Sequence, residues 1–216
     1  MLPTFRWTTF DVTGMLPPLW QQDAIEAAAA AEVRDFARTP VISREAPDVE
    51  HVTRGRFHAD QVTQRLPWLP QLYRSGFRSL AEEVVGESVA AARDSRYGAV
   101  LNVQRGRGMR FECHIDSNPL TGVLFFSDHE AGGGGELIFA HDQAASSMAE
   151  IDRSCSMIRS HAGHLIFFDG RRNPHYVRPL AQDEDTRVVA VMNYYLSSFP
   201  ESTRPAELNR HLYGDR

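Results

Sequence analysis

Three residues in the second half of the chain have the side chains and the surroundings of a metal site. His114 and Asp116 follow one apolar run, and His175 comes shortly after a second, residues 165–168. Two imidazoles and one carboxylate on one face of a metal leave the opposite face open, which is the ligand set of non-haem Fe(II) centres. The sequence therefore predicts that His114, Asp116 and His175 are the catalytic metal ligands.

An arginine further along the chain has the placement of an anion-binding residue. Arg187 lies twelve residues after His175 and opens a third apolar run, residues 188–196. A guanidinium group forms a bidentate, charge-assisted pair with a carboxylate. We expect Arg187 to bind the carboxylate of a co-substrate, and we expect that co-substrate to be 2-oxoglutarate.

A second His-x-Asp triplet, His58-Ala59-Asp60, shows that the motif alone does not define a site. No strand pattern leads into His58, and no later histidine followed by a strand-opening arginine accompanies it. The surroundings of His114 and Asp116 therefore distinguish them from this second copy.

The residues around the predicted site alternate between apolar runs and glycine-rich turns. Many short strands joined by such turns are typical of a barrel or of two sheets rolled against each other. The expected strands are residues 99–104, 109–114, 122–127, 136–140, 157–159, 165–168 and 188–196.

The first 96 residues predict mainly helical support for this β core. A short strand over residues 5–12 is followed by a helix that Pro17-Pro18 opens and that runs to about residue 37. Residues 39–66 lack periodicity, so we expect an irregular segment that is either a lid or a plain surface loop. A second helix is expected up to Val85, with Gly86 as its C-cap.

Taken in order, these motifs resemble the catalytic core of the Fe(II)/2-oxoglutarate dioxygenases, nearest to their prolyl-4-hydroxylase-like branch. The resemblance covers residues 97–196 and includes the turn Gly134-Gly135-Glu136-Leu137 between the two halves of the ligand set. It implies a mainly β protein with flanking helices, built on a double-stranded β-helix, or jelly roll, with iron at its mouth. The implied domain is single, residues 1–216, with N-terminal support (1–96), the catalytic core (97–200) and a tail (201–216) that ends in a short helix.

The resemblance also implies an activity. Fe(II), 2-oxoglutarate and dioxygen would react with release of succinate and CO2, with ascorbate as a candidate reductant. The expected outcome is hydroxylation of an unactivated C–H bond in a small polar metabolite, such as an amino acid or a natural-product intermediate. Desaturation, ring closure and epimerisation are alternative outcomes of the same chemistry. Because position 116 carries a carboxylate, we expect a site of the hydroxylase type and not of the halogenase type. A prolyl-hydroxylase-like enzyme acting on a peptide or protein is an alternative.

A different alternative is a cupin-like, metal-binding jelly roll. His161 and His164 could form a metal pair that His175 completes. The cupin pattern requires a dense cluster of histidines and a glutamate on one early strand, which this sequence lacks. We therefore expect His161 and His164 to be ordinary turn and strand residues.

The chain departs from the family pattern at two positions close to the co-substrate. Val189 stands where the family often has Ser or Thr, two residues after Arg187, and Arg105 stands where many members have Tyr. The second hydrogen-bond partner of 2-oxoglutarate must therefore come from elsewhere. Candidates by residue type are Asn102, Thr121 and Tyr195.

Strand alternation suggests which residues meet the substrate. Residues two apart on a strand share a face, so Glu112 and Arg110 would point inward with His114 unless a bulge intervenes. A charged side chain that faces an enclosed site is costly unless it is paired. We expect Arg110 and Glu112 either to bind a polar, charged substrate or to pair with each other.

Composition limits the classes of partner. The net charge is 23 − 28 = −5, which disfavours nucleic-acid binding, and no apolar run approaches the ~18 residues of a membrane span. Two cysteines provide no disulfide framework, and the N-terminus has no signal-peptide pattern. We expect a cytoplasmic enzyme that binds a small molecule and has no obligate protein partner.

Overall fold

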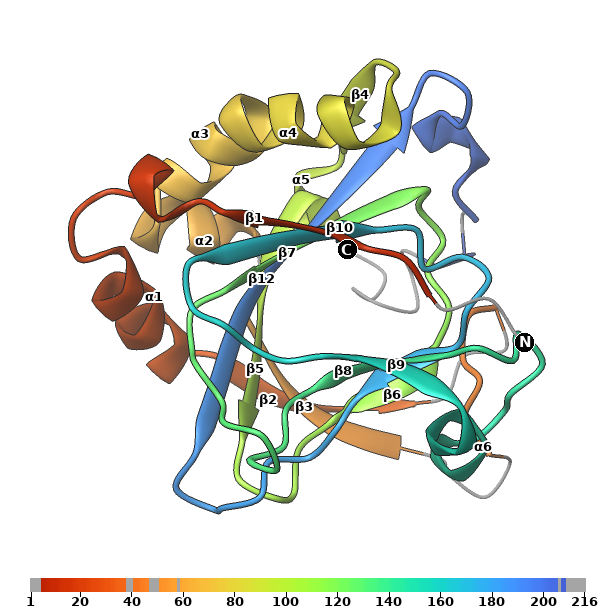
Figure 1. The fold of residues 1–216 in the computed structure, drawn as a ribbon. Helices are drawn as coiled ribbons and strands as arrows, with labels where there is room; N and C mark the ends of the chain where they lie inside the picture. Colours follow the sequence, from red (N-terminus) through yellow and green to blue (C-terminus); the bar gives the residue numbers. More distant parts are fainter. Residues whose placement is uncertain (1–4, 38–40, 47–50, 58, 206, 209–216) are drawn as a thin grey trace.

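The computed structural model describes residues 5–37, 41–46, 51–57, 59–205 and 207–208. Two antiparallel sheets lie face to face, and most of the helices pack outside the larger one (Figure 1). The mainly β architecture with helical support is therefore confirmed. The α-helices are α1 (Trp20–Ala29), α2 (Ala59–Arg65), α3 (Trp68–Arg74), α4 (Gly76–Val85), α5 (Ser95–Gly98) and α6 (Met148–Arg153), with 3-10 turns η1 (Thr13–Met15) and η2 (Glu201–Thr203).

The larger sheet has eight strands in the order β1-β10-β7-β12-β5-β3-β2, with β4 paired to β12. The long strand β12 lies near its middle and connects both halves of the sheet. The strands are β1 (Thr8–Asp11), β2 (Glu32–Ala37), β3 (His51–Phe57), β4 (Val89–Ala91), β5 (Ala99–Arg105), β7 (Leu120–Phe125), β10 (His164–Phe168) and β12 (Thr186–Leu196).

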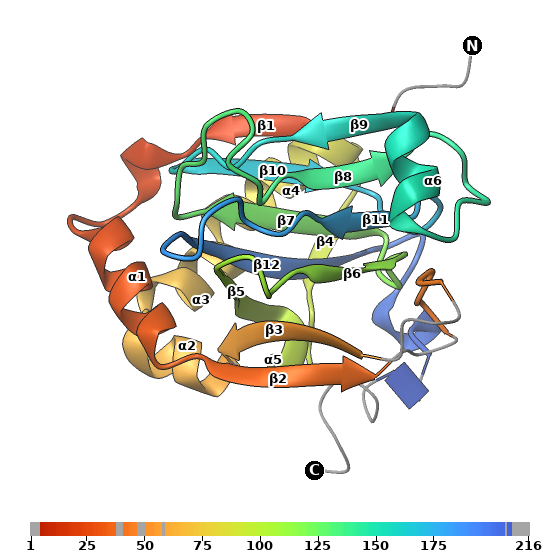
Figure 2. The ribbon, with the colours of Figure 1, turned by 90° about the horizontal axis from the view of Figure 1, so that it is seen from below.

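The smaller sheet has four strands in the order β6-β11-β8-β9. Figure 2 shows them in front of the larger sheet, with β9 over β1 and β6 over β12. Helix α6 covers part of its outer face. The strands are β6 (Phe111–His114), β8 (Leu137–Ala140), β9 (Cys155–Ile158) and β11 (His175–Val177).

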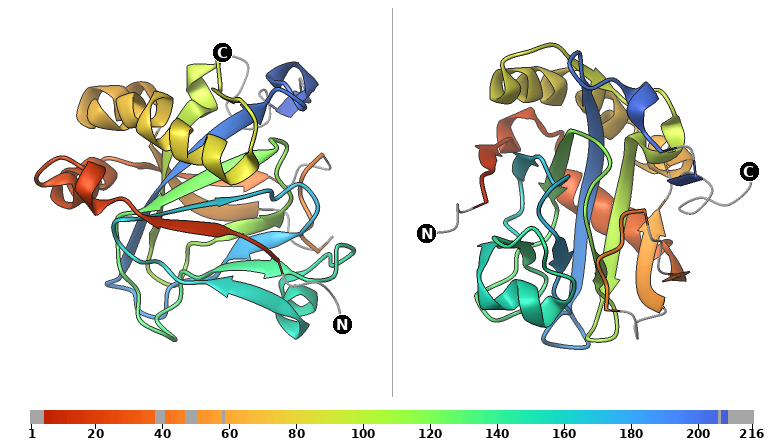
Figure 3. Two further views of the ribbon diagram at one scale, coloured as in Figure 1. Left: turned by 45° about the horizontal axis from the view of Figure 1, so that its top comes forward. Right: turned by 90° about the vertical axis from the view of Figure 1, so that its right-hand side faces the viewer.

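Alternation along β12 separates the two interiors of the molecule. Val188, Ala190 and Met192 face the helices and belong to the larger apolar core. Val189 faces the smaller sheet, where it packs in a second core that includes Phe139. Figure 3 shows the corresponding layers, with α3 and α4 on one side of the larger sheet and the smaller sheet on the other. One strand therefore supports the helical layer with one face and the interior of the roll with the other.

The first expected helix was too long. Helix α1 ends at Ala29, and residues 32–37 form strand β2, which pairs along its whole length with β3. The alanine-rich run up to Ala31 has a high intrinsic helix propensity, but tertiary contacts often outweigh such a propensity. Backbone pairing with β3 overrides it from Glu32 onward.

The expectation of an irregular segment over residues 39–66 was wrong for residues 51–57 and 59–65, which form a strand and a helix, whereas residues 41–46 are irregular. Strand β3 joins the larger sheet through β5, with Gly55 opposite Val103. A Cβ at Gly55 would lie 2.9 Å from the carbonyl oxygen of Val103, so the close approach of the strands needs a glycine here. Helix α2 follows, and His58 lies outside the described residues. Without periodicity in the sequence, only the partner strand reveals β3.

The remaining comparisons concern where the helices end and where they are interrupted. The second expected helix is interrupted at Ser75, whose φ of −124° and ψ of −99° separate α3 from α4. Gly86 ends α4 in the left-handed conformation, with φ of 70°, as expected for a C-cap. Helix α6 lies between the expected strands 136–140 and 157–159, and most of the helix expected in the tail lies outside the described residues. Among the helices described, none is long and apolar enough to cross a membrane.

Candidate active site

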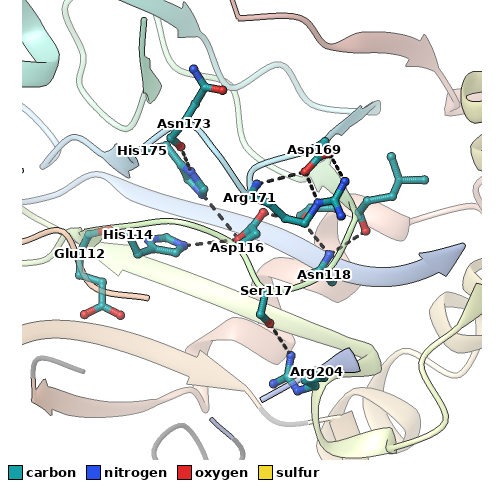
Figure 4. A network of polar contacts seen from close by, with 12 residues as sticks. Glu112, His114, Asp116, Ser117, Asn118, Asp169, Arg171, Asn173, His175 and Arg204 are labelled. Carbon is teal, nitrogen blue, oxygen red and sulfur yellow. Dashed lines mark hydrogen bonds and ion pairs between the residues drawn. The ribbon is translucent and has the colours of Figure 1, made fainter. Parts of the chain in front are cut away.

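Strand pairing brings the two predicted histidine ligands together. The pairing of β6 with β11 sets His175 opposite His114, and Asp116 follows two residues after β6 ends. The Nε2 atoms of His114 and His175 lie 3.7 and 3.6 Å from Oδ1 of Asp116. Figure 4 shows both rings directed at this carboxylate. Within the described part of the chain, no other group of three or more His, Cys, Asp or Glu has its ligand atoms close enough to hold a metal ion.

The other ring nitrogens of these histidines contact backbone carbonyl groups. Nδ1 of His114 lies 2.7 Å from the oxygen of Glu112, and Nδ1 of His175 lies 3.0 Å from the oxygen of Asn173. Since a carbonyl oxygen only accepts, each Nδ1 carries the proton. In the neutral ring, each Nε2 then has a lone pair that faces the cluster, as a metal ligand requires.

The carboxylate of Asp116 is oriented by a relay of hydrogen bonds. Asn118 donates to Oγ1 of Thr121 at 2.9 Å, and this hydroxyl donates to Oδ2 of Asp116 at 2.7 Å. Burial raises the pKa of Asp116, but the two imidazoles and the Thr121 hydrogen bond outweigh it, so the pKa is about 2. The group is thus ionised at neutral pH. Thr121, expected as a partner of 2-oxoglutarate, instead has its hydroxyl on the carboxylate.

Gly170, which the sequence did not single out, leaves the space in which these groups meet. Its carbonyl oxygen accepts a hydrogen bond from the backbone N–H of Asp116 at 3.0 Å. A Cβ at this position would collide with the Asp116 carboxylate and lie 2.8 Å from Cε1 of His175. The only sequence signal was a glycine directly after the strand β10 and Asp169, a pattern too common to single out.

Arg187 is fully buried in the interior of the roll. One of its terminal nitrogens donates to Oε1 of Gln104 at 3.3 Å, whereas Nε has no hydrogen-bond partner. Burial lowers the pKa of Arg187 to about 9, and the carboxylate of Glu136 opposes this shift. A buried guanidinium with an unsatisfied donor fits a carboxylate ligand. The residues present therefore fit both the metal and the acid.

Gln104 positions Arg187 and was missed by the sequence analysis. It is fully buried and lies directly opposite Arg187 across the pair β5–β12. Its amide nitrogen donates to the carbonyl oxygens of Arg178 at 3.1 Å and Met109 at 3.3 Å, which leaves Oε1 directed at Arg187. Only the register of β12 on β5 identifies this role.

The Gly-Gly-Glu-Leu turn packs against the same arginine. Gly135 has a φ of +75°, and a Cβ there would lie 2.9 Å from Cδ of Arg187. Its neighbour Gly134 has a φ of +79° and meets the backbone of Pro179 and Leu180. The two glycines are therefore required by backbone conformation and by the space that the arginine occupies.

The metal ligands and Arg187 line one cavity of about 130 Å³. Asn102 and Asn193 also reach it, whereas Tyr195 does not and packs with Ala92 and Tyr97 instead. Two segments far apart in the sequence close the cavity on the outside. They contribute Ile42 before the metal-binding strand and Arg204 and Leu208 from the tail.

A bulge changes the expected inward face of β6. His175 pairs with His114 and Val177 with Phe111, so β6 has one residue more than β11 between the two pairs. Glu112 still lines the cavity, but the Arg110 side chain turns away from it. Arg110 forms an ion pair with Glu45, with Nη2 and Oε2 3.2 Å apart. Arg110 therefore pairs with Glu45 and not with Glu112, and its side chain does not line the cavity.

Residues 98–195 match the family model of the 2OG-Fe(II) oxygenase superfamily. Just under half of the chain is therefore similar to the core of the 2OG-Fe(II) oxygenases. The matched segment includes all three metal-site residues and Arg187, and the oxygenases of this superfamily use Fe(II) and 2-oxoglutarate. A comparison with curated proteins found no significant match.

Several solved structures share the fold of this chain. AviO1 from Streptomyces viridochromogenes is 15% identical, with a TM-score of 0.64 and coverage of 94% of each chain. The epimerase SnoN from nogalamycin biosynthesis is 15% identical, with a TM-score of 0.63, over 95% of this chain and 84% of its own. HygX from Streptomyces hygroscopicus, with nickel and 2-oxoglutarate bound, is 10% identical, with a TM-score of 0.61, over 92% and 85%.

The relay to Asp116 predicts a metal-binding defect in Thr121→Val, which removes the hydroxyl and keeps the shape. Loss of a group that orients a metal ligand typically costs about 10- to 100-fold in affinity. We expect weakening of this size in an anaerobic Fe(II) titration, and Thr121→Ser should restore tight binding. Wild-type affinity in the valine variant would show that the hydroxyl does not support the ligand.

The position of Gln104 predicts that Gln104→Leu weakens 2-oxoglutarate binding roughly fivefold or more. Leaving a buried charged donor without its acceptor costs ~1–3 kcal/mol. Anaerobic calorimetry with the metal-loaded protein measures the affinity. Gln64→Leu, at an exposed position of α2, is the matched control and should bind normally. Equal affinities for both variants would contradict a positioning role.

Proposed function

We propose that this chain is an Fe(II)/2-oxoglutarate-dependent hydroxylase that acts on an unactivated C–H bond of a small polar metabolite. One observation carries the proposal. A single cavity holds two histidines and an ionised aspartate at one place and a fully buried arginine with an unsatisfied donor at another. A cupin-like binder would need the first feature but not the second.

The chain's own residues have distinct tasks in this reaction. His114, Asp116 and His175 would hold the metal, and Arg187 would bind the 5-carboxylate of 2-oxoglutarate. When bound, the metal and 2-oxoglutarate supply the oxidation by dioxygen, which releases succinate and CO2. Apolar side chains of β7 and β12, such as Val123 and Val189, line the cavity and exclude water.

The size of the cavity supports a small molecule over a peptide. Its volume is about 130 Å³, and residues from distant segments, Ile42, Arg204 and Leu208, contribute to its lining. Two structural relatives were crystallised with natural products, SnoN with nogalamycin RO and HygX with hygromycin B. SnoN is named as an epimerase and a further relative, SnoK, as a carbocyclase, so the mass of the product is needed to identify the reaction type.

A succinate assay tests the proposal. The Fe(II)-loaded protein in air should convert 2-oxoglutarate slowly to succinate without substrate, and faster with a substrate. The screen covers free amino acids, peptides and biosynthetic intermediates, and mass spectrometry checks for products that have gained one oxygen atom. Absence of any succinate would refute the oxygenase activity, and stimulation by peptides alone would refute the small-molecule substrate.

His175→Ala should abolish succinate formation, because it removes one of three protein ligands and leaves its place to solvent. The expected result is loss of tight Fe(II) binding, seen in an anaerobic titration, with little change in thermal stability. His141→Ala is the control, since that imidazole bonds to Ser154 and Ser156 away from the cavity. Full iron affinity and turnover in His175→Ala would mean that the metal binds elsewhere.

Arg187→Gln should raise the KM for 2-oxoglutarate by tens-fold or more. Truncating one partner of a desolvated charge pair typically costs ~2–5 kcal/mol. Initial succinate rates at varied 2-oxoglutarate give the KM, and Arg153→Gln, at an exposed position of α6, is the control. Were the KM unchanged, the anchor would be a different cation, with Arg178 the next candidate.

A further inference from the structure

We propose that Arg204 binds a carboxylate group of the substrate, so that the natural substrate is an organic acid. The inference rests on the proposed function and narrows its substrate class. Arg204 lies in the tail, outside the segment that matches the family model, and it lines the same cavity as the metal ligands.

The tail is held over the cavity by specific contacts of the turn η2. The carboxylate of Glu201 accepts hydrogen bonds from the backbone N–H of Arg93, at 2.9 Å, and from the hydroxyl of Tyr97. These contacts attach the turn to the segment between β4 and α5. Three residues later the chain reaches Arg204, and Leu208 is then buried at the cavity wall. The position of Arg204 is therefore built into the fold.

Two of the contacts of the Arg204 guanidinium are with Tyr97 and Ser117. It stacks over the ring of Tyr97, with its central carbon 3.8 Å from the ring centroid, and Nη1 donates to Oγ of Ser117 at 3.0 Å. Figure 4 shows this contact beside Asp116, the residue that precedes Ser117. A stacked guanidinium keeps its planar fork fixed, which suits bidentate binding of a carboxylate. A substrate acid held there would lie next to the metal site.

The cavity thus has one arginine at each end. Arg187 and Asn193 both line it from β12, and their separation of six positions corresponds to ~20 Å of strand. Asn193 donates to the carbonyl oxygen of Tyr97, and the guanidinium of Arg204 stacks on the ring of the same tyrosine. Thr121, which orients the metal ligand Asp116, pairs with Asn193 across the sheet. Two separate acids can therefore bind, 2-oxoglutarate at Arg187 and the substrate at Arg204.

Binding measurements test this without knowledge of the substrate. The wild-type protein, loaded with Fe(II) and saturating 2-oxoglutarate under anaerobic conditions, is titrated with small acids, each paired with its neutral primary amide. Benzoate, phenylacetate and free amino acids are the probes, and saturation-transfer NMR detects binding. We expect acids to bind more tightly than their amides, and Arg204→Gln to weaken acid binding tenfold or more and to remove the preference. Arg204→Lys, which keeps the charge but not the fork, should fall between.

Two further variants show whether a loss of acid binding is due to Arg204 itself. Arg153→Gln should bind like the wild type, and calorimetric 2-oxoglutarate binding by Arg204→Gln shows whether its cavity is folded. If that variant does not fold, Ser117→Ala, which removes the hydroxyl that orients the guanidinium, must reduce the acid preference. The inference is overturned if acids and amides bind alike or not at all, or if the preference survives in the folded Arg204→Gln or in Ser117→Ala. It is also overturned if saturating 2-oxoglutarate displaces the acids, since they would then occupy the Arg187 site.

Failure of the proposed function gives a different result. In that case the wild-type protein makes no succinate in air, whereas acid binding can still depend on Arg204. Conversely, normal succinate formation with no acid preference would remove only the assignment of Arg204.

Discussion

The antiparallel pairing of β6 with β11 is the constraint on which the site depends. It sets His175 directly opposite His114, and a slip of one residue would turn either side chain to the other face of the sheet. The segment before the metal-binding strand reinforces this register. The backbone N–H of Arg44 donates to the carbonyl oxygen of Cys113, and the N–H of Ile115 donates to the carbonyl oxygen of Ile42. Strand pairing thus determines where both imidazoles lie.

The larger sheet contributes the second constraint, which is the burial of Arg187. Removing a guanidinium from water is costly, and the amide of Gln104, the ring of Phe125 and the charge of Glu136 compensate for it in part. The apolar core of the helical side and the glycines of the facing turn hold the strand and the arginine in place. A carboxylate ligand would complete the hydrogen bonding of this arginine.

The hydrogen-bonding roles of the polar residues around the cavity could not be predicted from residue type alone. Thr121 was a candidate for the co-substrate because it carries a hydroxyl, yet the turn at Asn118 directs that hydroxyl to Asp116. Gln104 was not a candidate, yet its position opposite Arg187 makes it the nearest acceptor. Both outcomes follow from strand register, which pairs residues distant in the sequence.

The sequence by itself determined the metal-site residues, Arg187 and the jelly-roll class, because local spacing and apolar runs encode strands and their ends. It could not predict β2 and β3, whose pairing with β5 outweighs their weak local pattern. Nor could it predict the bulge in β6 or the ion pair of Arg110 with Glu45. The position of the tail, which places Arg204 at the cavity, was also not predictable. These features depend on contacts between residues far apart in the chain, and such contacts exist only once the sheets and the tail have packed together.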